Sequence, residues 1–209
     1  LEAMRPVFTP AFSIIRDNLK KLGTIRRVTF SYCEYSSRYD AFKAGTVKNA
    51  FNPALSNASL LDIGVYCIHP YIKLFGLPDR ILAEETRLEN GFNGQGTILM
   101  KHSGMLAELL YSKIATSYLP NEIQGENGSM RISRISDPRE VSIRYRGGET
   151  ELIYRESREN DMYYELKEFL RLIETGADTT EADNASRMTM RVMDDVRRQL
   201  GIVFPADKG

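Results

Sequence analysis

The chain has 209 residues, with 28 basic and 28 acidic side chains and a formal net charge of zero. This balance argues against binding to nucleic acid or to an anionic membrane through charge. Apolar residues make up 42% of the chain, as in ordinary globular proteins, and no apolar run approaches the roughly 20 residues that span a bilayer.

The first part of the sequence predicts a helix, a strand and a long connection. Residues 9–22 carry an apolar stripe at helical spacing, with Thr9 as a cap and Pro10 at the first helical position. Residues 24–35 alternate as a strand does, whereas residues 36–57 show no sustained period. A connection of that length is usually functional or disordered, so we expect an irregular loop there.

The next helix, predicted over residues 57–75, is apolar on nearly all sides. At about 100° per residue, four polar side chains fall on one narrow stripe of this helix, namely Asp62, Tyr66, His69 and Lys73. Gly64 lies within this segment and indicates the close approach of another element. Pro70 has no N–H to donate to the carbonyl of Tyr66, so we expect a kink or a break there.

From residue 79 onward the pattern is a run of short strands followed by helices. We expect strands over residues 80–89, 96–102, 105–114, 118–125, 129–134, 139–146 and 149–155, and helices over residues 161–176 and 185–201. This order predicts an α+β fold with a largely antiparallel open sheet and with helices packed on one face.

The polar stripe permits a structural and a chemical interpretation. In the structural one, Asp62 and Lys73 lie at the surface and His69 is a hydrogen-bonded core residue. In the chemical one, Tyr66 transfers a proton, and Asp62 or His69 tunes it. Tyrosine titrates near pH 10, so this role requires a cation nearby. Lys73 lies two turns away, and we therefore expect the cation to come from elsewhere.

The counts of cysteine and histidine limit the chemistry further. Cys33 and Cys67 are too few for a disulfide framework, which favours a reducing compartment, and we expect a cytoplasmic protein. Besides His69 the sequence has only His102, and no cluster of cysteine and histidine accompanies them, so we predict no metal site. The sequence begins at Leu1 without an initiator methionine, and we expect the chain to be part of a longer protein.

Four segments resemble a known family of oxidoreductases. They are EAMRP near the start, GTIRRVTFSY, LLDIGVY and FGLP, and they occur in the same order as in that family. The chain resembles the glucose–fructose oxidoreductase, inositol dehydrogenase and MocA family over nearly its whole length. The resemblance is strongest to the branch that contains dimeric dihydrodiol dehydrogenases, and LLDIGVY is its most specific part.

The resemblance implies which domain this chain represents. Members have an N-terminal Rossmann domain, which binds NAD or NADP and carries a catalytic lysine in a Glu-Lys-Pro motif, and a C-terminal α+β domain that forms the substrate wall and oligomerises. This chain has neither a Gly-x-Gly-x-x-Gly nor a Glu-Lys-Pro motif. We therefore expect the N-terminal Rossmann domain to be absent from it. Residues 1–22 would be the last strand and helix of the cofactor domain, and residues 23–209 the substrate-binding and oligomerisation domain.

The resemblance also assigns roles to residues of the predicted helix at 57–75. In this branch the motif is Asp-x-Gly-x-Tyr, which matches Asp62, Gly64 and Tyr66, with the tyrosine as proton donor or acceptor and the aspartate beside it. The inositol dehydrogenase branch has a histidine in place of the tyrosine, so that catalytic role does not pass to His69. The Arg-x-Phe-x-Pro and Gly-Gly-Gly motifs of the branch are not conserved here, which leaves the substrate identity open.

Together these observations predict the substrate domain of an NAD(P)-dependent oxidoreductase that transfers a hydride between nicotinamide and a carbon of a sugar-like or cyclic alcohol. The missing domain would bind the NAD or NADP and supply the lysine as the required cation, so this fragment alone should be inactive. We expect Tyr66 and Asp62 to be catalytic, and His69, Arg38 and Tyr39 to contact the small-molecule substrate. A homo-oligomer should form through the open face of the sheet. The alternative is a non-catalytic sugar-binding or assembly domain with the same fold.

Overall fold

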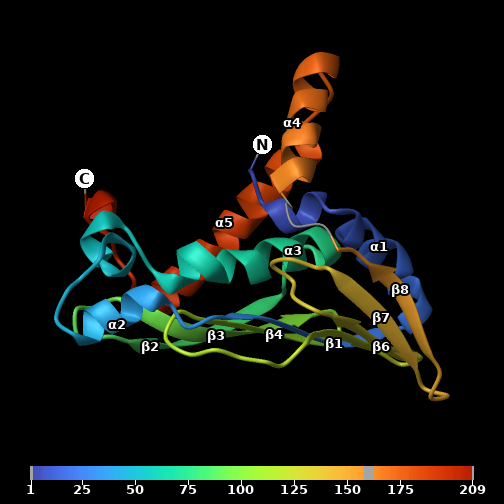
Figure 1. Cartoon of the computed structure of the whole chain (residues 1–209), viewed down its shortest axis with the longest axis horizontal. Coiled ribbons are helices and arrows are strands. Elements are labelled where there is room, and N and C mark those ends of the chain that lie inside the picture. Colours follow the sequence, from blue (N-terminus) through green and yellow to red (C-terminus); the bar gives the residue numbers. More distant parts are fainter. Residues whose placement is uncertain (1, 158–161, 209) are drawn as a thin grey trace.

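Helices cover one face of an eight-stranded sheet in the computed structural model, which describes residues 2–157 and 162–208 (Figure 1). The strands lie in the order β2-β3-β4-β1-β5-β6-β7-β8. Neighbouring strands are antiparallel except for β1 and β4, which run parallel. The bounds are Ile25–Cys33 for β1, Arg80–Arg87 for β2, Asn93–His102 for β3, Met105–Ser112 for β4, Asn121–Gly125 for β5, Gly128–Ile132 for β6, Glu140–Tyr145 for β7 and Thr150–Arg155 for β8.

The helices gather above the sheet, as Figure 1 shows for α1, α3 and α5. Their bounds are Pro10–Asn18 for α1, Ser37–Lys43 for α2, Val65–Phe75 for α3, Met162–Thr175 for α4 and Thr180–Leu200 for α5. Helix α4 projects away from the sheet, while the other face of the sheet carries no helix (Figure 1). The α+β class, the largely antiparallel open sheet and the one-sided helices are therefore confirmed.

The core lies between this helical layer and the sheet. Alternate strand residues point into it, so that Val28 and Phe30 are fully buried on β1 while Thr29 between them is partly exposed. Buried residues of α3, such as Ile68 and Ile72, pack onto the same cluster. Burial of such apolar side chains is the main favourable term in folding.

Two segments differ from the predictions made for residues 2–57. The expected irregular loop contains α2, which Ser36 caps by accepting a hydrogen bond from the backbone N–H of Arg38, and two short 3₁₀ turns. Phe42 and Phe51 of this region form a small second core with Phe92, the residue that precedes β3. In place of the strand expected near the start, Arg5–Phe8 form a 3₁₀ turn. The domain boundary between residues 22 and 23 stays a prediction.

Later elements agree with the sequence pattern, apart from the ends of some elements; β3 begins three residues before its predicted start and β5 three residues after it. Helix α5 begins at Thr180, five residues before the predicted start. The break expected at Pro70 is absent, because α3 runs unbroken to Phe75. Buried residues on both sides of the proline hold the helix on the sheet and outweigh the one missing backbone hydrogen bond. Among the described residues, no helix combines the length and the apolar character that crossing a membrane requires.

The start of the predicted helix at residues 57–75 has a special geometry. Leu60–Gly64 form a π-helical turn that leads directly into α3, and we call it the π turn. A Cβ atom added to Gly64 would lie 3.2 Å from the ring of Tyr111 on β4, which confirms the close approach inferred from this glycine. Single π turns within helices occur often at functional sites.

His69 joins α3 to α5. Its side chain is 3% exposed, and its Nδ1 atom lies 3.0 Å from the hydroxyl of Thr189. Because the Thr189 hydroxyl donates its one hydrogen to the carbonyl of Ala185, Nδ1 of His69 must be the donor in this pair. Burial lowers the pKa of His69 to about 4, and the charge of Lys73 acts in the same direction. The imidazole is therefore neutral near pH 7.

We expect acid to destabilise the fold through His69 before the carboxylates titrate. The folded protein binds this proton near pH 4, whereas an unperturbed histidine binds it near pH 6.5. The unfolded state therefore takes up more protons as the pH falls, and stability decreases through this window. Between pH 8 and pH 5 the loss is about 2 kcal/mol, or a fall of about 4–8 °C in melting temperature.

Melting curves at pH 8, 6.5 and 5 measure this effect in the wild type and in His69→Gln. The glutamine variant should lack most of the acid-dependent fall, since it removes the titrating group. Thr189→Val is the matched control, because it removes the hydrogen-bond partner but leaves the buried imidazole, and it should keep the acid-dependent fall. The same fall in the wild type and in His69→Gln would contradict the assignment.

Candidate active site

Asp62 lies in the π turn and pairs with a lysine that is distant in sequence. The Nζ atom of Lys113 donates to Oδ2 of Asp62 at 2.6 Å. The Lys113 side chain is 7% exposed, whereas that of Asp62 is 56% exposed. A nearly buried ammonium group is thus paired with a carboxylate whose other side faces solvent.

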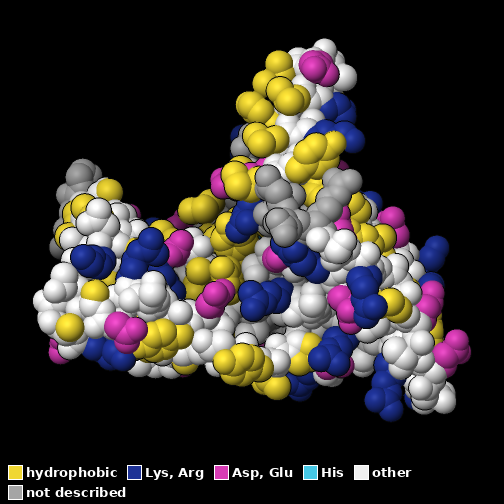
Figure 2. Space-filling view, in the orientation of Figure 1, with side chains coloured by type: hydrophobic (Ala, Val, Ile, Leu, Met, Phe, Trp, Pro, Cys, Tyr) yellow, Lys and Arg dark blue, Asp and Glu magenta, His cyan; other side chains and the backbone are white. Residues whose placement is uncertain are grey.

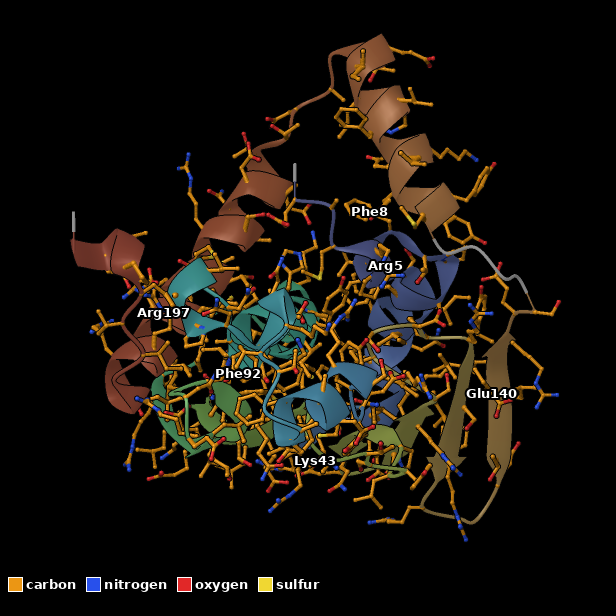
Figure 3. All side chains as sticks on the ribbon, turned by 60° about the vertical axis from the view of Figure 1, so that its left-hand side comes forward. Arg5, Phe8, Lys43, Phe92, Glu140 and Arg197 are labelled. Atoms are coloured by element: carbon orange, nitrogen blue, oxygen red, sulfur yellow. The ribbon has the colours of Figure 1, made fainter. Side chains whose placement is uncertain are left out.

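Aromatic rings surround the rest of the Lys113 ammonium group. Its Nζ atom lies 5.1 Å from the ring centroid of Phe51 and 5.7 Å from that of Phe92, which is labelled in Figure 3. It also donates to the backbone carbonyl of Ala50 at 3.2 Å. The faces of aromatic rings attract cations, so these contacts offset part of the cost of removing the ammonium group from water.

Tyr66 follows the π turn and is half-buried between two other segments. Its ring meets that of Tyr32, near the end of β1, edge to face at a centroid distance of 5.7 Å. The guanidinium group of Arg5 lies over the same ring, 5.7 Å from its centroid. Within residues 2–157 and 162–208, no side chain forms a hydrogen bond to the Tyr66 hydroxyl, and the residue is partly exposed.

Tyr32 adds a second phenol to the site. Burial raises the pKa of the Tyr32 hydroxyl above its ordinary value, and the charge of Glu34 raises it further. Tyr32 therefore stays protonated at neutral pH and can donate a hydrogen bond to an oxygen of a ligand.

A polar cavity of about 380 Å³ opens beside Tyr32. Its lining is rich in hydroxyl and amide groups, and it includes Ser31, Tyr32, Tyr35, Thr116, Ser117, Asn121, Ser133 and Ser136. Glu34 and Arg134 add one charge of each sign. Groups of this kind recognise a small ligand with several hydroxyls, because each can donate or accept a hydrogen bond.

A larger hollow of about 1160 Å³ lies between α1, α3, α4 and α5. His69 and Lys73 line it, but Asp62, Tyr66 and Lys113 do not. The polar residues predicted on one stripe of α3 are thus divided between two surroundings. The π turn changes the rotation per residue only before α3, so it affects the direction of Asp62 alone. Tyr66 and Lys73 lie on one side of α3 but about 10 Å apart along its axis, so they meet different neighbours.

The other candidate substrate contacts lie on α2. Tyr39 stacks on the rings of Phe42 and Phe51, at centroid distances of 6.0 and 5.9 Å, and so touches the aromatic surroundings of Lys113. The side chain of Arg38 is exposed. Asp62 and Tyr66 are thus one helical turn apart, Tyr39 is linked to Asp62 only through Phe51 and Lys113, and His69 faces α5.

Three residues of the site escaped the sequence analysis, namely Arg5, Tyr32 and Lys113. Arg5 and Tyr32 occur inside the segments EAMRP and GTIRRVTFSY, which carried the resemblance, but nothing local marks their contact with Tyr66. Lys113 directly follows a strand and has no motif around it. Among the described residues, no group of three or more His, Cys, Asp or Glu side chains has the geometry to hold a metal ion.

The chain is similar to a known protein family and to several known proteins. Residues 18–131 match the family model of the GFO/IDH/MocA C-terminal domain. The whole chain is 48% identical over 210 residues to scyllo-inositol 2-dehydrogenase (NADP(+)) IolU of Bacillus subtilis (strain 168), of which it covers 64%. It is 37% identical over 206 residues to the uncharacterized oxidoreductase YgjR of Escherichia coli (strain K12), a match that spans 99% of this chain and 63% of that protein.

More distant relatives share the fold. Trans-1,2-dihydrobenzene-1,2-diol dehydrogenase of Danio rerio is 28% identical over 177 residues, which span 77% of this chain and 52% of that protein. The 3-ketoreductase KijD10 of Actinomadura kijaniata, solved with NADP and TDP-benzene, superposes with a TM-score of 0.77 at 18% identity. That match covers 94% of this chain and 61% of the solved chain.

The chain thus spans 63–64% of the length of the two relatives with the highest identity given above. The family model covers more than half of the chain, and both of these relatives match nearly all of it. The chain therefore belongs to the GFO/IDH/MocA family of oxidoreductases and contains that family's C-terminal domain.

Proposed function

We propose that this chain is the substrate domain of an NAD(P)-dependent oxidoreductase that acts on a sugar-like or cyclic alcohol. The observation that carries this proposal is the position of Tyr66, whose partly exposed side chain follows the paired Asp62 by one helical turn and contacts Tyr32, which lines the polar cavity. The B. subtilis relative, named as an NADP(+)-dependent scyllo-inositol dehydrogenase, supports both the cofactor and a polyol substrate.

In this reaction the chain's own residues handle the substrate and its proton. When bound, nicotinamide supplies the hydride acceptor or donor. In the reduction direction a hydride supplied by nicotinamide would add to the carbonyl carbon, the C=O bond would become a C–O single bond, and the Tyr66 hydroxyl would donate its proton to that oxygen; oxidation would reverse these steps. Tyr32 donates a hydrogen bond to a second substrate oxygen, and the polar cavity orients the remaining hydroxyls. A positioned acid or base of this kind contributes about 10²–10⁴ to the rate.

The described residues do not fit the dinucleotide itself. In dinucleotide-binding folds, a glycine-rich turn leads from a strand into a helix whose N-terminus holds the pyrophosphate. Here β1 leads into α2 through Glu34, Tyr35 and Ser36, without a glycine. We propose that the cofactor is bound by a separate domain, in the part of the relatives' length that this chain does not span.

A non-catalytic sugar-binding domain is the second candidate. The cavity beside Tyr32, with its many hydroxyl groups, favours it, because such a lining binds a polyol whether or not a reaction follows. The two candidates differ in what they require of the Tyr66 hydroxyl.

Tyr66→Phe separates these candidates in a longer protein that includes the cofactor domain. We expect kcat to fall by about 10²–10⁴, because the proton acceptor is lost. Affinity for the nicotinamide cofactor should stay within about twofold, and the melting temperature should change little, because no described side chain bonds to this hydroxyl. Steady-state kinetics with NADP and scyllo-inositol, together with a melting curve, measure all three quantities.

Tyr71→Phe is the matched control for that experiment. Tyr71 is fully buried on the same helix, and its hydroxyl lies 3.3 Å from Nδ1 of His102. This variant should lower stability by roughly 1 kcal/mol and leave kcat near the wild-type value. A Tyr66→Phe enzyme with normal turnover would exclude Tyr66 from the mechanism and favour the binding domain.

We expect this chain alone to bind nicotinamide cofactors only weakly and to show no turnover, because its sequence has no Gly-x-Gly-x-x-Gly motif to hold the pyrophosphate. Calorimetric titration of the 209-residue chain with NAD⁺, NADH, NADP⁺ and NADPH measures this directly. Micromolar affinity for any of the four forms would show that the chain holds a cofactor site after all.

We also propose that the chain forms a homodimer or a larger oligomer through the uncovered face of the sheet. Leu82 and Leu99 are paired across β2 and β3, and they and Leu106 on β4 are 36–47% exposed. Their neighbours Ile98 and Met100 point into the core, so these leucines lie on the face without helices. Contiguous exposed apolar side chains commonly mark an interface between proteins.

Light scattering at micromolar concentration should therefore report a dimer or a larger species, and Leu99→Lys should shift it toward the monomer by placing a charge in the interface. Leu166→Lys is the matched control on α4, whose exposed apolar side chains stand out in Figure 2. Dissociation by Leu166→Lys and not by Leu99→Lys would assign the interface to α4 instead.

A further inference from the structure

Lys113 occupies a junction that the proposed reaction has not used. We propose that it is a positioning residue, whose ammonium group holds the Asp62 carboxylate and thereby fixes the π turn that presents Tyr66 to the substrate. The inference rests on the proposed function and deepens it, because it assigns the support of the proton-transfer residue to a second charge within this same chain.

The backbone of Lys113 is held on both sides. Its N–H donates to the carbonyl of Gly94 at 3.0 Å, and its carbonyl accepts from the N–H of Ser36 at 2.9 Å. These bonds join the end of β4 to the start of β3 and to the cap of α2. These backbone hydrogen bonds fix the position of the Lys113 Cα atom, so that only the side chain is free to change its conformation.

The π turn is anchored at the same junction. The hydroxyl of Ser59 donates to the Gly94 carbonyl at 2.9 Å, so this one oxygen accepts from both Ser59 and Lys113. The N–H of Leu60 donates to the side-chain oxygen of Asn93 at 2.9 Å. The beginning of the π turn and the base of the lysine side chain are thus attached to two adjacent residues of β3.

The ion pair closes this arrangement from the other side. Nζ of Lys113 reaches Asp62, in the middle of the π turn, at 2.6 Å. An exposed carboxylate without a partner would sample several rotamers, and holding it costs side-chain entropy. Here the partner is a nearly buried ammonium group with a fixed base, so the carboxylate is restrained by the interior of the protein.

The free energy expected of this ion pair indicates that it positions Asp62 more than it stabilises the fold. A pair with one solvent-exposed partner adds little to stability, and a buried charge costs free energy that a hydrophobic side chain of similar size would not. The surroundings of Lys113 are aromatic, with Phe51 and Phe92 beside its Nζ atom, and methionine would suit them. The role of the Lys113 charge is therefore to hold Asp62, which lies one helical turn before Tyr66.

The test uses Lys113→Met, Asp62→Asn and the double variant in the longer enzyme with its cofactor domain. We expect each single change to lower kcat about 10- to 100-fold, as removal of a group that supports a catalytic residue does, with KM for the cofactor unchanged. Because both residues act through one contact, the kcat of the double variant should be about that of the single variant with the lower kcat. Losses that multiply, or a normal kcat in Lys113→Met, would overturn the proposal.

Two further variants serve as controls for this test. Lys73→Met removes the 2.5 Å ion pair that Lys73 on α3 forms with Glu181 on α5, and it should keep kcat within about twofold of the wild type. Lys113→Gln keeps a donor for the Ala50 carbonyl but removes the charge. If Lys113→Met alone fails to fold, Lys113→Gln decides by the same criteria.

A measurement on this chain separates the inference from the proposed reaction. In ¹H–¹⁵N spectra, Lys113→Met and Asp62→Asn should shift the same amide signals of residues 59–66, whereas Lys73→Met should leave them in place. Unchanged signals in Lys113→Met would overturn the positioning role even if the enzyme is active. Normal turnover in Tyr66→Phe, with these shifts present, would instead overturn the proposed function alone.

Discussion

The parallel pairing of β1 with β4 is the constraint on which the candidate site depends. The two strands run in the same direction in register, with Tyr32 opposite Tyr111 and Cys33 opposite Ser112. Their C-terminal ends therefore meet at one edge of the sheet, which places Tyr32 and Lys113 close together although 81 positions separate them in the sequence. An antiparallel pair would bring one of these two ends to the opposite edge.

The same pairing explains why α3 lies where it does. Parallel strands need a crossover connection, and a helix within it packs on the face of the sheet. Residues 34–104 form this connection, and α3 is its long helix. The helix starts near the C-terminal ends of β1 and β4, so that the π turn meets Lys113 and Tyr66 meets Tyr32. Topology thus brings the acidic, phenolic and basic groups together.

The polar residues of the π turn and of α3 lie in two different surroundings. Asp62 is paired with Lys113 and Tyr66 contacts Tyr32 near the C-terminal ends of β4 and β1, where we propose that the substrate binds. His69 faces α5, where burial keeps it neutral and its hydrogen bond with Thr189 joins two helices of the covering layer. The structural interpretation of the polar stripe holds for His69. For Asp62 and Tyr66 the chemical interpretation, in which Tyr66 transfers a proton, stays our proposal.

Local patterns in the sequence were sufficient for the fold class and for most of the elements, but not for α2 or for the 3₁₀ turn at Arg5–Phe8. Alternation with a period of two identified the strands, helical spacing identified α1, α3, α4 and α5, and their order indicated a one-sided α+β sheet. The Asp-x-Gly-x-Tyr motif located Asp62, Gly64 and Tyr66 within one segment. Only the tertiary structure revealed the π turn, the direction of His69, and Lys113 as the partner of Asp62. A salt bridge between residues 51 positions apart leaves no trace in a local period, because it depends on strand order and on how a helix crosses the sheet.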